Sequence, residues 1–191
     1  MARHCWETSD PLYERYHDEE WGRPVADERG VYERLCLEGF QSGLSWLTIL
    51  RKREAFRAAF EGFDPDVVAG FGGRDVTRLL ADASIVRHRG KIEAAIANAR
   101  ATIALRSATP LHELVWQHRP ADHHAPASQA DWAASTPESG ALAKALRSAG
   151  FRFVGPTTLY AAQQACGVVN DHLADCWVRE AVEAERARFS A

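Results

Sequence analysis

The 191-residue sequence has no apolar run that approaches the roughly 18 residues needed to span a membrane. Its first residues contain no apolar core of the kind found in export signals. The alternating pattern of a half-buried β-strand is also scarce: only residues 151–154 show it, and that stretch is too short and too closely flanked by glycine. These absences predict an all-α protein in the cytoplasm, with no membrane contact.

A basic excess is missing as well, because 23 lysines and arginines stand against 26 acidic residues and the net charge is −3. Proteins that neutralise nucleic-acid phosphates usually show positive charge, at least locally. Basic clusters do occur at residues 51–53, 87–91 and 144–152. Clusters of this kind on helices are more often solvated faces than binding patches. Charge alone therefore argues mildly against nucleic acid and does not exclude it.

The composition, 46% hydrophobic and 26% charged, is that of a single globular domain with a substantial core. We expect a middle helical lobe at about residues 28–135, with the termini and residues 136–176 forming a second lobe beside it. The four cysteines lie in a chain without an export signal, so free thiols or metal ligands are favoured over disulfides.

Helix starts are marked by capping side chains that precede a proline at the first helical position. The pairs are Asp10-Pro11, Asp64-Pro65, Thr109-Pro110 and Thr136-Pro137. Between them, apolar residues recur with helical spacing, as at Ile92, Ala95, Ile96 and Ala99. The polar, proline-bearing stretch at residues 119–128 is interpreted as a surface loop between helices.

A metal site is suggested by His172 and Cys176, which would share one face if the segment were helical. A buried cysteine near a capping histidine is the commoner explanation of such a pair. His4, Cys5 and His17 strengthen the metal hypothesis, because the two ends of a domain often lie close together. Four His and Cys ligands would suit a closed structural zinc that ties the termini without taking part in chemistry.

A second motif is a turn between two helices. One helical run ends at Gly150, and Gly155-Pro156-Thr157 begins another. The N–H groups at the start of a helix favour a phosphate, and Arg147 and Arg152 would add positive charge nearby. This is the pattern of a helix-hairpin-helix, which grips the DNA backbone without reading its sequence. An ordinary packing corner between helices explains the spacing equally well.

A third motif is the segment at residues 37–46, which places Glu38 in an apolar run and two glycines, Gly39 and Gly43, within one expected helix. The glycines would let a flat base approach the backbone. The sequence also has six tryptophans, and Trp6, Trp21 and Trp46 lie near Tyr13 and Tyr16 in the N-terminal third. A buried acid beside aromatic rings is a suitable pocket for a flipped cationic base. Taken locally, a solvated Glu38 and aromatic core residues remain the favoured interpretation.

Five sequence motifs are distinctive enough to suggest a family. They are DPLY..YHD.EWG from residue 10, LEGFQSGLSW from residue 37, RHRGKI from residue 87, FRFVGPTT from residue 151 and VNDH…C from residue 169. They resemble the DNA-3-methyladenine glycosylase I family, and the resemblance runs from about residue 3 to residue 176. The resemblance implies an all-α helix-hairpin-helix glycosylase fold with a structural zinc between the termini. It also implies hydrolysis of the N-glycosidic bond of 3-methyladenine in double-stranded, alkylated DNA.

The resemblance assigns roles to individual residues. Glu38 is the key acid, and the base-binding residues are Tyr16, Trp46, Trp21, Trp6 and Tyr13. The expected DNA contacts are Gly155, Thr157 and Arg152. The expected zinc ligands are His17, His172, Cys176 and His4, with Cys5 as the alternative fourth ligand, since the family's cysteine aligns with His4.

Related glycosylases place a catalytic aspartate in the region of Asp171 and Asp175, and we expect neither residue to take that role here. Relatives that also cleave the strand have a lysine at the position of Thr157, so a monofunctional hydrolase without lyase activity is implied. The alternatives are a non-catalytic zinc-stabilised DNA-binding module, a glycosylase for another alkylated purine, and a plain helical interaction protein. A monomer is expected, because no coiled-coil seam is present.

Overall fold

The computed structural model describes residues 5–6 and 8–189, and within them no β-strand is found. This confirms the all-α prediction. The helices are α1 (Pro11–Glu19), α2 (Glu28–Gln41), α3 (Trp46–Ala59), α4 (Pro65–Val68), α5 (Gly73–Ala81), α6 (Arg89–Leu105), α7 (Leu111–Gln117), α8 (Pro137–Ser148), α9 (Pro156–Ala165) and α10 (Arg179–Arg188), with 3₁₀ turns η1 (Glu61–Phe63) and η2 (Gln129–Asp131). None of the described helices is long and apolar enough to cross a membrane.

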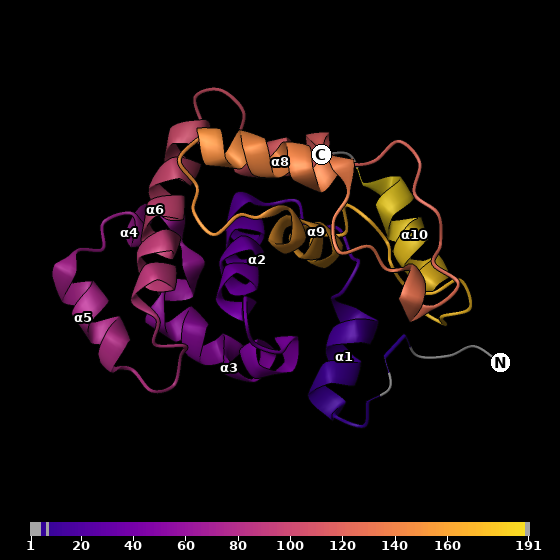
Figure 1. Ribbon diagram of the computed structural model, residues 1–191, viewed down its shortest axis with the longest axis horizontal. Helices are drawn as coiled ribbons and strands as arrows, with labels where there is room; N and C mark the ends of the chain where they lie inside the picture. Colours follow the sequence, from indigo (N-terminus) through magenta and orange to yellow (C-terminus); the bar gives the residue numbers. More distant parts are fainter. Residues whose placement is uncertain (1–4, 7, 190–191) are drawn as a thin grey trace.

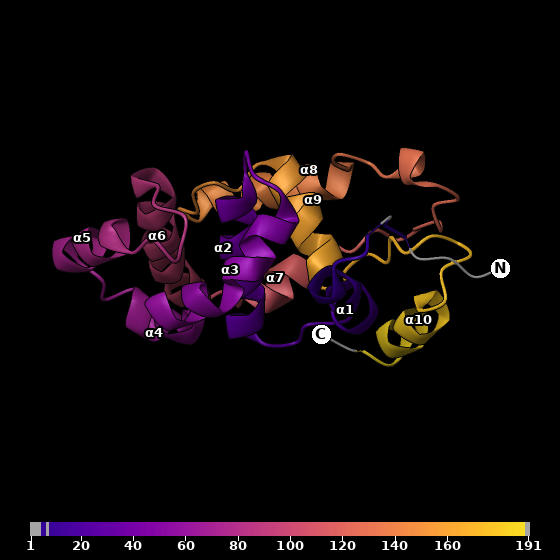
Figure 2. The same cartoon turned by 90° about the horizontal axis from the view of Figure 1, so that it is seen from below.

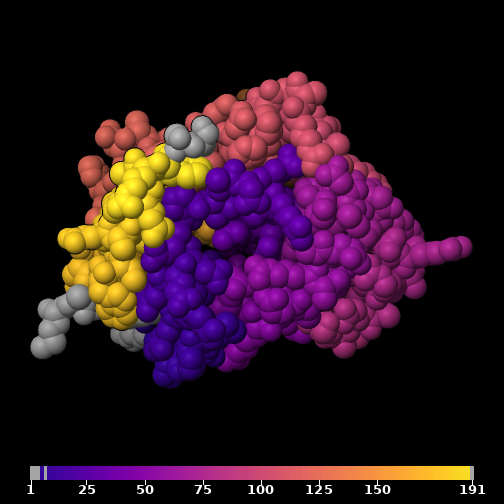
Figure 3. Space-filling view, turned by 180° about the vertical axis from the view of Figure 1, so that it is seen from behind, coloured from indigo at the N-terminus to yellow at the C-terminus, as the bar shows by residue number. Residues whose placement is uncertain are grey.

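The helices form an elongated body in which α4, α5 and α6 lie at one end and α1 and α10 at the other (Figures 1 and 2). Helices α2 and α9 lie between these ends and pack against each other. In the space-filling view, the yellow C-terminal segment lies directly against the indigo N-terminal segment (Figure 3). The described N-terminal and C-terminal segments therefore lie side by side.

Helix α2 is the central element, since it packs against α3, α6, α7 and α9. Its residues from Val31 to Leu37 are buried almost without interruption, as are Glu38, Gly39 and Phe40. A helix enclosed on nearly all sides has no polar face to offer its acidic residues. This enclosure decides that Glu38 is buried.

Three of the four predicted helix starts are confirmed. Asp10 accepts hydrogen bonds from two main-chain N–H groups at the start of α1, and Asp64 and Thr136 each accept one such bond at the starts of α4 and α8. The fourth prediction is wrong by one residue, because Pro110 has an extended ψ of 149° and stands before the helix, which begins at Leu111. Proline fixes φ but leaves ψ free, so the pair alone does not place the first helical residue.

The turn between α2 and α3 corrects the hypothesis that Gly39 and Gly43 share one helix. Helix α2 ends at Gln41, and Gly43 has a φ of +81°, the left-handed conformation that glycine adopts without strain. The Lys91 ammonium of α6 donates hydrogen bonds to the carbonyls of Phe40 (2.9 Å) and Ser42 (2.5 Å). It thereby satisfies carbonyls that have no partner within α2.

Candidate functional site

Glu38 projects from the C-terminal half of α2 and is only 6% exposed. Burial raises the pKa of its carboxyl to about 8. Within the described part of the chain, no side chain forms an ion pair with it. A carboxyl group in such surroundings favours a partner that brings its own positive charge or hydrogen-bond donors.

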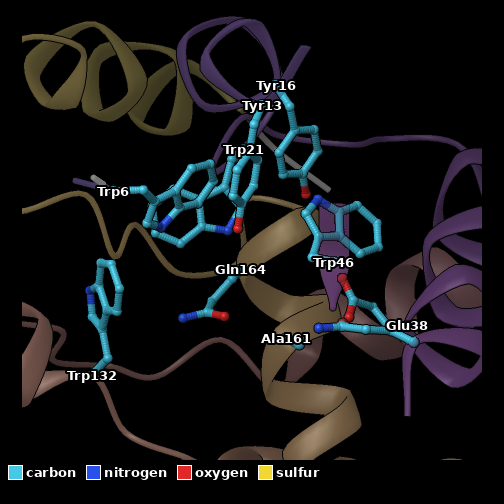
Figure 4. Close-up of a pocket in the computed structure, with 10 residues that line it drawn as sticks. Trp6, Tyr13, Tyr16, Trp21, Glu38, Trp46, Trp132, Ala161 and Gln164 are labelled. Carbon is cyan, nitrogen blue, oxygen red and sulfur yellow. The ribbon is translucent and has the colours of Figure 1, made fainter. Parts of the chain in front are cut away.

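An aromatic wall faces Glu38 across a cavity (Figure 4). The rings of Trp6 and Tyr13 stack with centroids 4.5 Å apart, and Trp21 lies 4.9 Å from Trp6. Tyr16 and Trp46 form a second pair, with centroids 5.2 Å apart. The capped start of α1 places the two tyrosines, and Ser45 caps α3 so that Trp46 is its first residue. The five aromatic residues predicted to bind the base thus lie together.

Two polar groups of this wall are available to a ligand. The Nε1 of Trp46 is buried and has no hydrogen-bond acceptor among the described residues. Burial, with the nearby charge of Glu38, raises the pKa of Tyr16 well above its ordinary value. The Tyr16 hydroxyl therefore keeps its proton and can donate a hydrogen bond to a ligand.

The cavity measures about 180 Å³, well below the roughly 300–1,000 Å³ of pockets for drug-sized ligands. A small flat ring system suits such a space. The residues that line it are Trp6, Tyr13, Tyr16, Trp21, Glu38, Gln41, Trp46, Trp132, Ala161 and Gln164.

Four of these residues were not predicted from the sequence to belong to the site: Gln41, Trp132, Ala161 and Gln164. Only Trp132 carried a signal, as a tryptophan in a polar stretch. Neither Gly39 nor Gly43 lines the cavity, which corrects the idea that these glycines admit the base. Gly39 instead faces Phe153 of the hairpin, 3.8 Å from where its Cβ would lie.

A cluster of four buried ligand-type residues lies behind this wall. The ligand atoms of Cys5, His17, His172 and Cys176 all lie within 4.8 Å of one another. The Nε2 of His17 lies 3.2 Å from the Nδ1 of His172, and the sulfurs of Cys5 and Cys176 each lie 3.6 Å from that same Nδ1. An ion in tetrahedral coordination, with bonds of about 2.0 Å to nitrogen and 2.3 Å to sulfur, requires distances of this order between its ligand atoms. The cluster could therefore hold a metal ion.

The second nitrogen of each imidazole is already engaged. The Nδ1 of His17 lies 2.7 Å from the carboxylate of Asp18, and the Nε2 of His172 lies 3.0 Å from the carbonyl of Trp21. Such bonds fix the ring orientation and leave the opposite nitrogen facing the cluster. Hydrogen bonding from Cys5, and then from the two imidazoles, lowers the pKa of the Cys176 thiol, which favours the thiolate that binds metals.

One expectation about this cluster is modified: His172 and Cys176 do not share a helix, because they lie in a segment of turns between α9 and α10. Among the described residues, Cys5 is the fourth member of the cluster, and its sulfur accepts a hydrogen bond from the N–H of Leu173. His4, the other candidate, lies outside the described residues.

The predicted hairpin connects α8 to α9. Residues 151–154 are irregular, and Gly155 is the N-cap residue of α9. Asn98 of α6 holds the turn by accepting from the N–H of Arg152 (2.7 Å) and donating to its carbonyl (3.1 Å). The side chains of Arg152 and Thr157 are exposed, so the expected DNA contacts are accessible.

The fold and site define an all-α protein of the helix-hairpin-helix type, with an aromatic pocket around a buried acid and, behind it, a Cys and His cluster that could hold a metal ion. A model of the methyladenine glycosylase family matches residues 6–180, and the chain belongs to that family. The chain is 48% identical to DNA-3-methyladenine glycosylase 1 of Escherichia coli over 181 residues, 92% of this chain and 96% of that protein.

Solved structures agree. The crystal structure of a 3-methyladenine DNA glycosylase I matches with a TM-score of 0.88 and 48% identity, covering 92% of this chain and 98% of that one. The Staphylococcus aureus enzyme, studied for its recognition of 3-methyladenine, matches with a TM-score of 0.87 and 33% identity, covering 92% of this chain and 95% of that one. These matches confirm the resemblance deduced from the sequence motifs.

Proposed function

We propose that this protein hydrolyses the N-glycosidic bond of 3-methyladenine in alkylated DNA and so begins base excision repair. The observation that carries the proposal is the buried carboxyl of Glu38, which faces stacked aromatic rings across a cavity of about 180 Å³. The E. coli relative is named for the same activity, and the S. aureus relative for recognition of the same base.

The pocket would select the damaged base by its charge. 3-Methyladenine in DNA is cationic, so a carboxylate at Glu38 attracts it, whereas neutral adenine offers no such gain. Trp46 would stack on the base, with Trp21, Trp6 and Tyr13 completing the wall. The hydroxyl of Tyr16 would supply a hydrogen bond.

The reaction then needs little acid catalysis, because a cationic purine is already a good leaving group. The role of the protein is to hold the flipped nucleotide while water attacks the anomeric carbon. Thr157 offers no amine, so no Schiff base forms and the DNA strand stays uncleaved.

Double-stranded DNA is the proposed partner, held at the start of α9. There Gly155 and Thr157 would present main-chain N–H groups to a phosphate, and Arg152 would add a charge. We also propose that the chain works as a monomer in the cytoplasm. In that compartment, the thiols of Cys5 and Cys176 stay reduced.

Zinc is the proposed occupant of the four-residue cluster, because two thiolates and two imidazoles in tetrahedral reach are its preferred donors. It would join the chain termini and do no chemistry, since four protein ligands leave no open position. We propose that the chain is one domain, with a middle helical lobe at residues 28–135 beside a zinc-bearing lobe built from the termini and residues 136–176.

Release of free base tests this function. The full-length protein is incubated with methylated duplex DNA, and the released bases are separated by chromatography. Free 3-methyladenine is expected. Binding without release would favour the non-catalytic DNA-binding module, and release of a different purine would favour the glycosylase of another specificity.

A further inference from the structure

Trp132 belongs to the cavity although it lies far from the other aromatic residues in sequence. Its ring packs edge-on against Trp21, with centroids 6.0 Å apart and planes at 78°. In Figure 4 it stands on the opposite side of the cavity from Glu38, with Gln164 between them. It therefore closes the end of the cavity that the carboxyl group does not reach.

The residues around Trp132 are held in place by hydrogen bonds and polar contacts to other segments of the chain. We call residues 119–136, which connect α7 to α8, the pocket loop. The Nε1 of Trp132 donates to the carbonyl of Asp171 (2.9 Å), and His123 lies 2.8 Å from the carboxylate of the same residue. Gln129 donates to the carbonyl of Cys5 at 2.6 Å.

All of these bonds lead to the segments that carry the Cys and His cluster. Cys5 is a member of that cluster, and Asp171 precedes another member. The N–H of Ala174, two residues before Cys176, donates to the carbonyl of Pro126 in the pocket loop (2.8 Å). The pocket loop is thus bonded at several points to the segments that carry the cluster, and these bonds hold Trp132 in place as a wall of the cavity.

We propose that Trp132 is a specificity-determining residue, which limits the size of the base that the pocket accepts. This inference rests on the proposed function and extends it from the charge of the base to its size. A held aromatic ring excludes atoms beyond the outline of a small purine, because an oversized base would have to displace a loop with four anchoring bonds. Glu38 would select charge at one end of the cavity and Trp132 would select size at the other.

The test compares the affinities of three free bases for the full-length protein, measured by calorimetry. The bases are 3-methyladenine, 3-ethyladenine and 1,N6-ethenoadenine, in which the purine is enlarged on different edges. One methylene in a closed apolar pocket changes affinity roughly 10- to 200-fold. The Trp132→Ala variant should therefore improve the affinity for at least one larger base, relative to 3-methyladenine, by about tenfold or more.

Two further variants keep the test decisive. His124→Ala alters an exposed side chain of the same loop that does not line the cavity, so its affinity ratios should equal those of the wild type. Trp132→Leu serves if the alanine variant does not fold, as judged by circular dichroism and metal content. Ratios within about twofold of the wild type for both larger bases would overturn the inference. If the wild type neither binds nor releases 3-methyladenine, the proposed function itself fails.

Discussion

The Nε2 of His172 donates a hydrogen bond to the main-chain carbonyl of Trp21 at 3.0 Å, because a carbonyl can only accept. This single bond connects a member of the Cys and His cluster to a wall of the cavity. Trp6 makes a second connection, since its ring packs edge-on against His17 at 5.0 Å and also lines the cavity. The shape of the pocket therefore depends on the integrity of the cluster.

Loss of the metal should weaken both the fold and the pocket. His172→Ala should reduce bound zinc from one ion per chain to a small fraction, lower the melting temperature and reduce the release of 3-methyladenine. The reason is that metal binding and folding of such a cluster are one process. Metal analysis and thermal unfolding measure these effects.

Cys166→Ala is the matched control for a buried site, because Cys166 is fully buried but lies outside the cluster. It should keep its zinc. Purified wild-type protein without any metal, yet fully folded and active, would show that the cluster is not a zinc site.

Removal of the acidic group should abolish most of the activity and leave the fold intact. Glu38→Gln keeps the size of the side chain but cannot carry the charge that attracts a cationic base. By analogy with other electrostatic groups in active sites, excision should fall about 100-fold or more. Single-turnover release of 3-methyladenine measures the loss, and unchanged zinc content shows that the structure persists. Wild-type rates in this variant would disprove the role of Glu38.

The pH dependence of excision should follow the same carboxyl group. Burial raises the pKa of Glu38 to about 8, so the free enzyme gains its charge only as the pH rises through that value. The kcat/KM of the wild type should therefore increase between about pH 7 and pH 9, because it reports ionisation of the free enzyme. The Glu38→Gln profile should lack this rise, and a rise of equal size in both proteins would assign it to another group.

Stability should change in the opposite direction. Between its ordinary pKa of 4.5 and the raised value of about 8, Glu38 is protonated in the folded protein and ionised in the unfolded one. Folding takes up a proton in this window, so the stability of the wild type falls as the pH rises through it. Glu38→Gln should be more stable than the wild type above pH 8, by up to about 5 kcal/mol, and similar to it below pH 4.5.

Urea unfolding of both proteins at pH 4.5 and pH 9 measures this difference. The Glu113→Gln variant, which alters an exposed side chain, is the control. Its free energy of unfolding should differ from that of the wild type by the same amount at pH 4.5 and at pH 9. A Glu38→Gln variant that is less stable than the wild type at pH 9 would mean that the carboxylate has a stabilising partner in the folded state.

The hairpin makes a separate prediction about DNA. Arg152→Ala should weaken binding to damaged and undamaged duplexes alike, and it should reduce the slope of log K against log salt by about 1. The affinity for free 3-methyladenine should not change, because Arg152 does not line the cavity. Fluorescence anisotropy over a salt series measures the effect. Arg74→Ala, an exposed arginine on α5, is the control and should leave the slope unchanged.

Local signals in the sequence predicted the local structure well where the chemistry is itself local. Asp10 and Thr136 cap their helices as expected, because a capping side chain reaches only two or three residues along the chain. The prediction failed at Pro110, where the free ψ angle moved the helix start. The prediction that the helix continues through Gly43 also failed. Nothing in the apolar pattern showed that Lys91 would bond the carbonyl groups at the C-terminal end of α2.

The sequence by itself determined the all-α class, the family, and the residue types of the pocket and the cluster, because motif residues keep their identity whatever their surroundings. Only the tertiary structure decided that Glu38 is buried, since its burial comes from four helices packed around α2. The same holds for Cys5 in the cluster and for Trp132 in the cavity. Both reach their places through bonds to Asp171, Leu173 and other residues distant in the chain, and spacing along a sequence carries no record of such contacts.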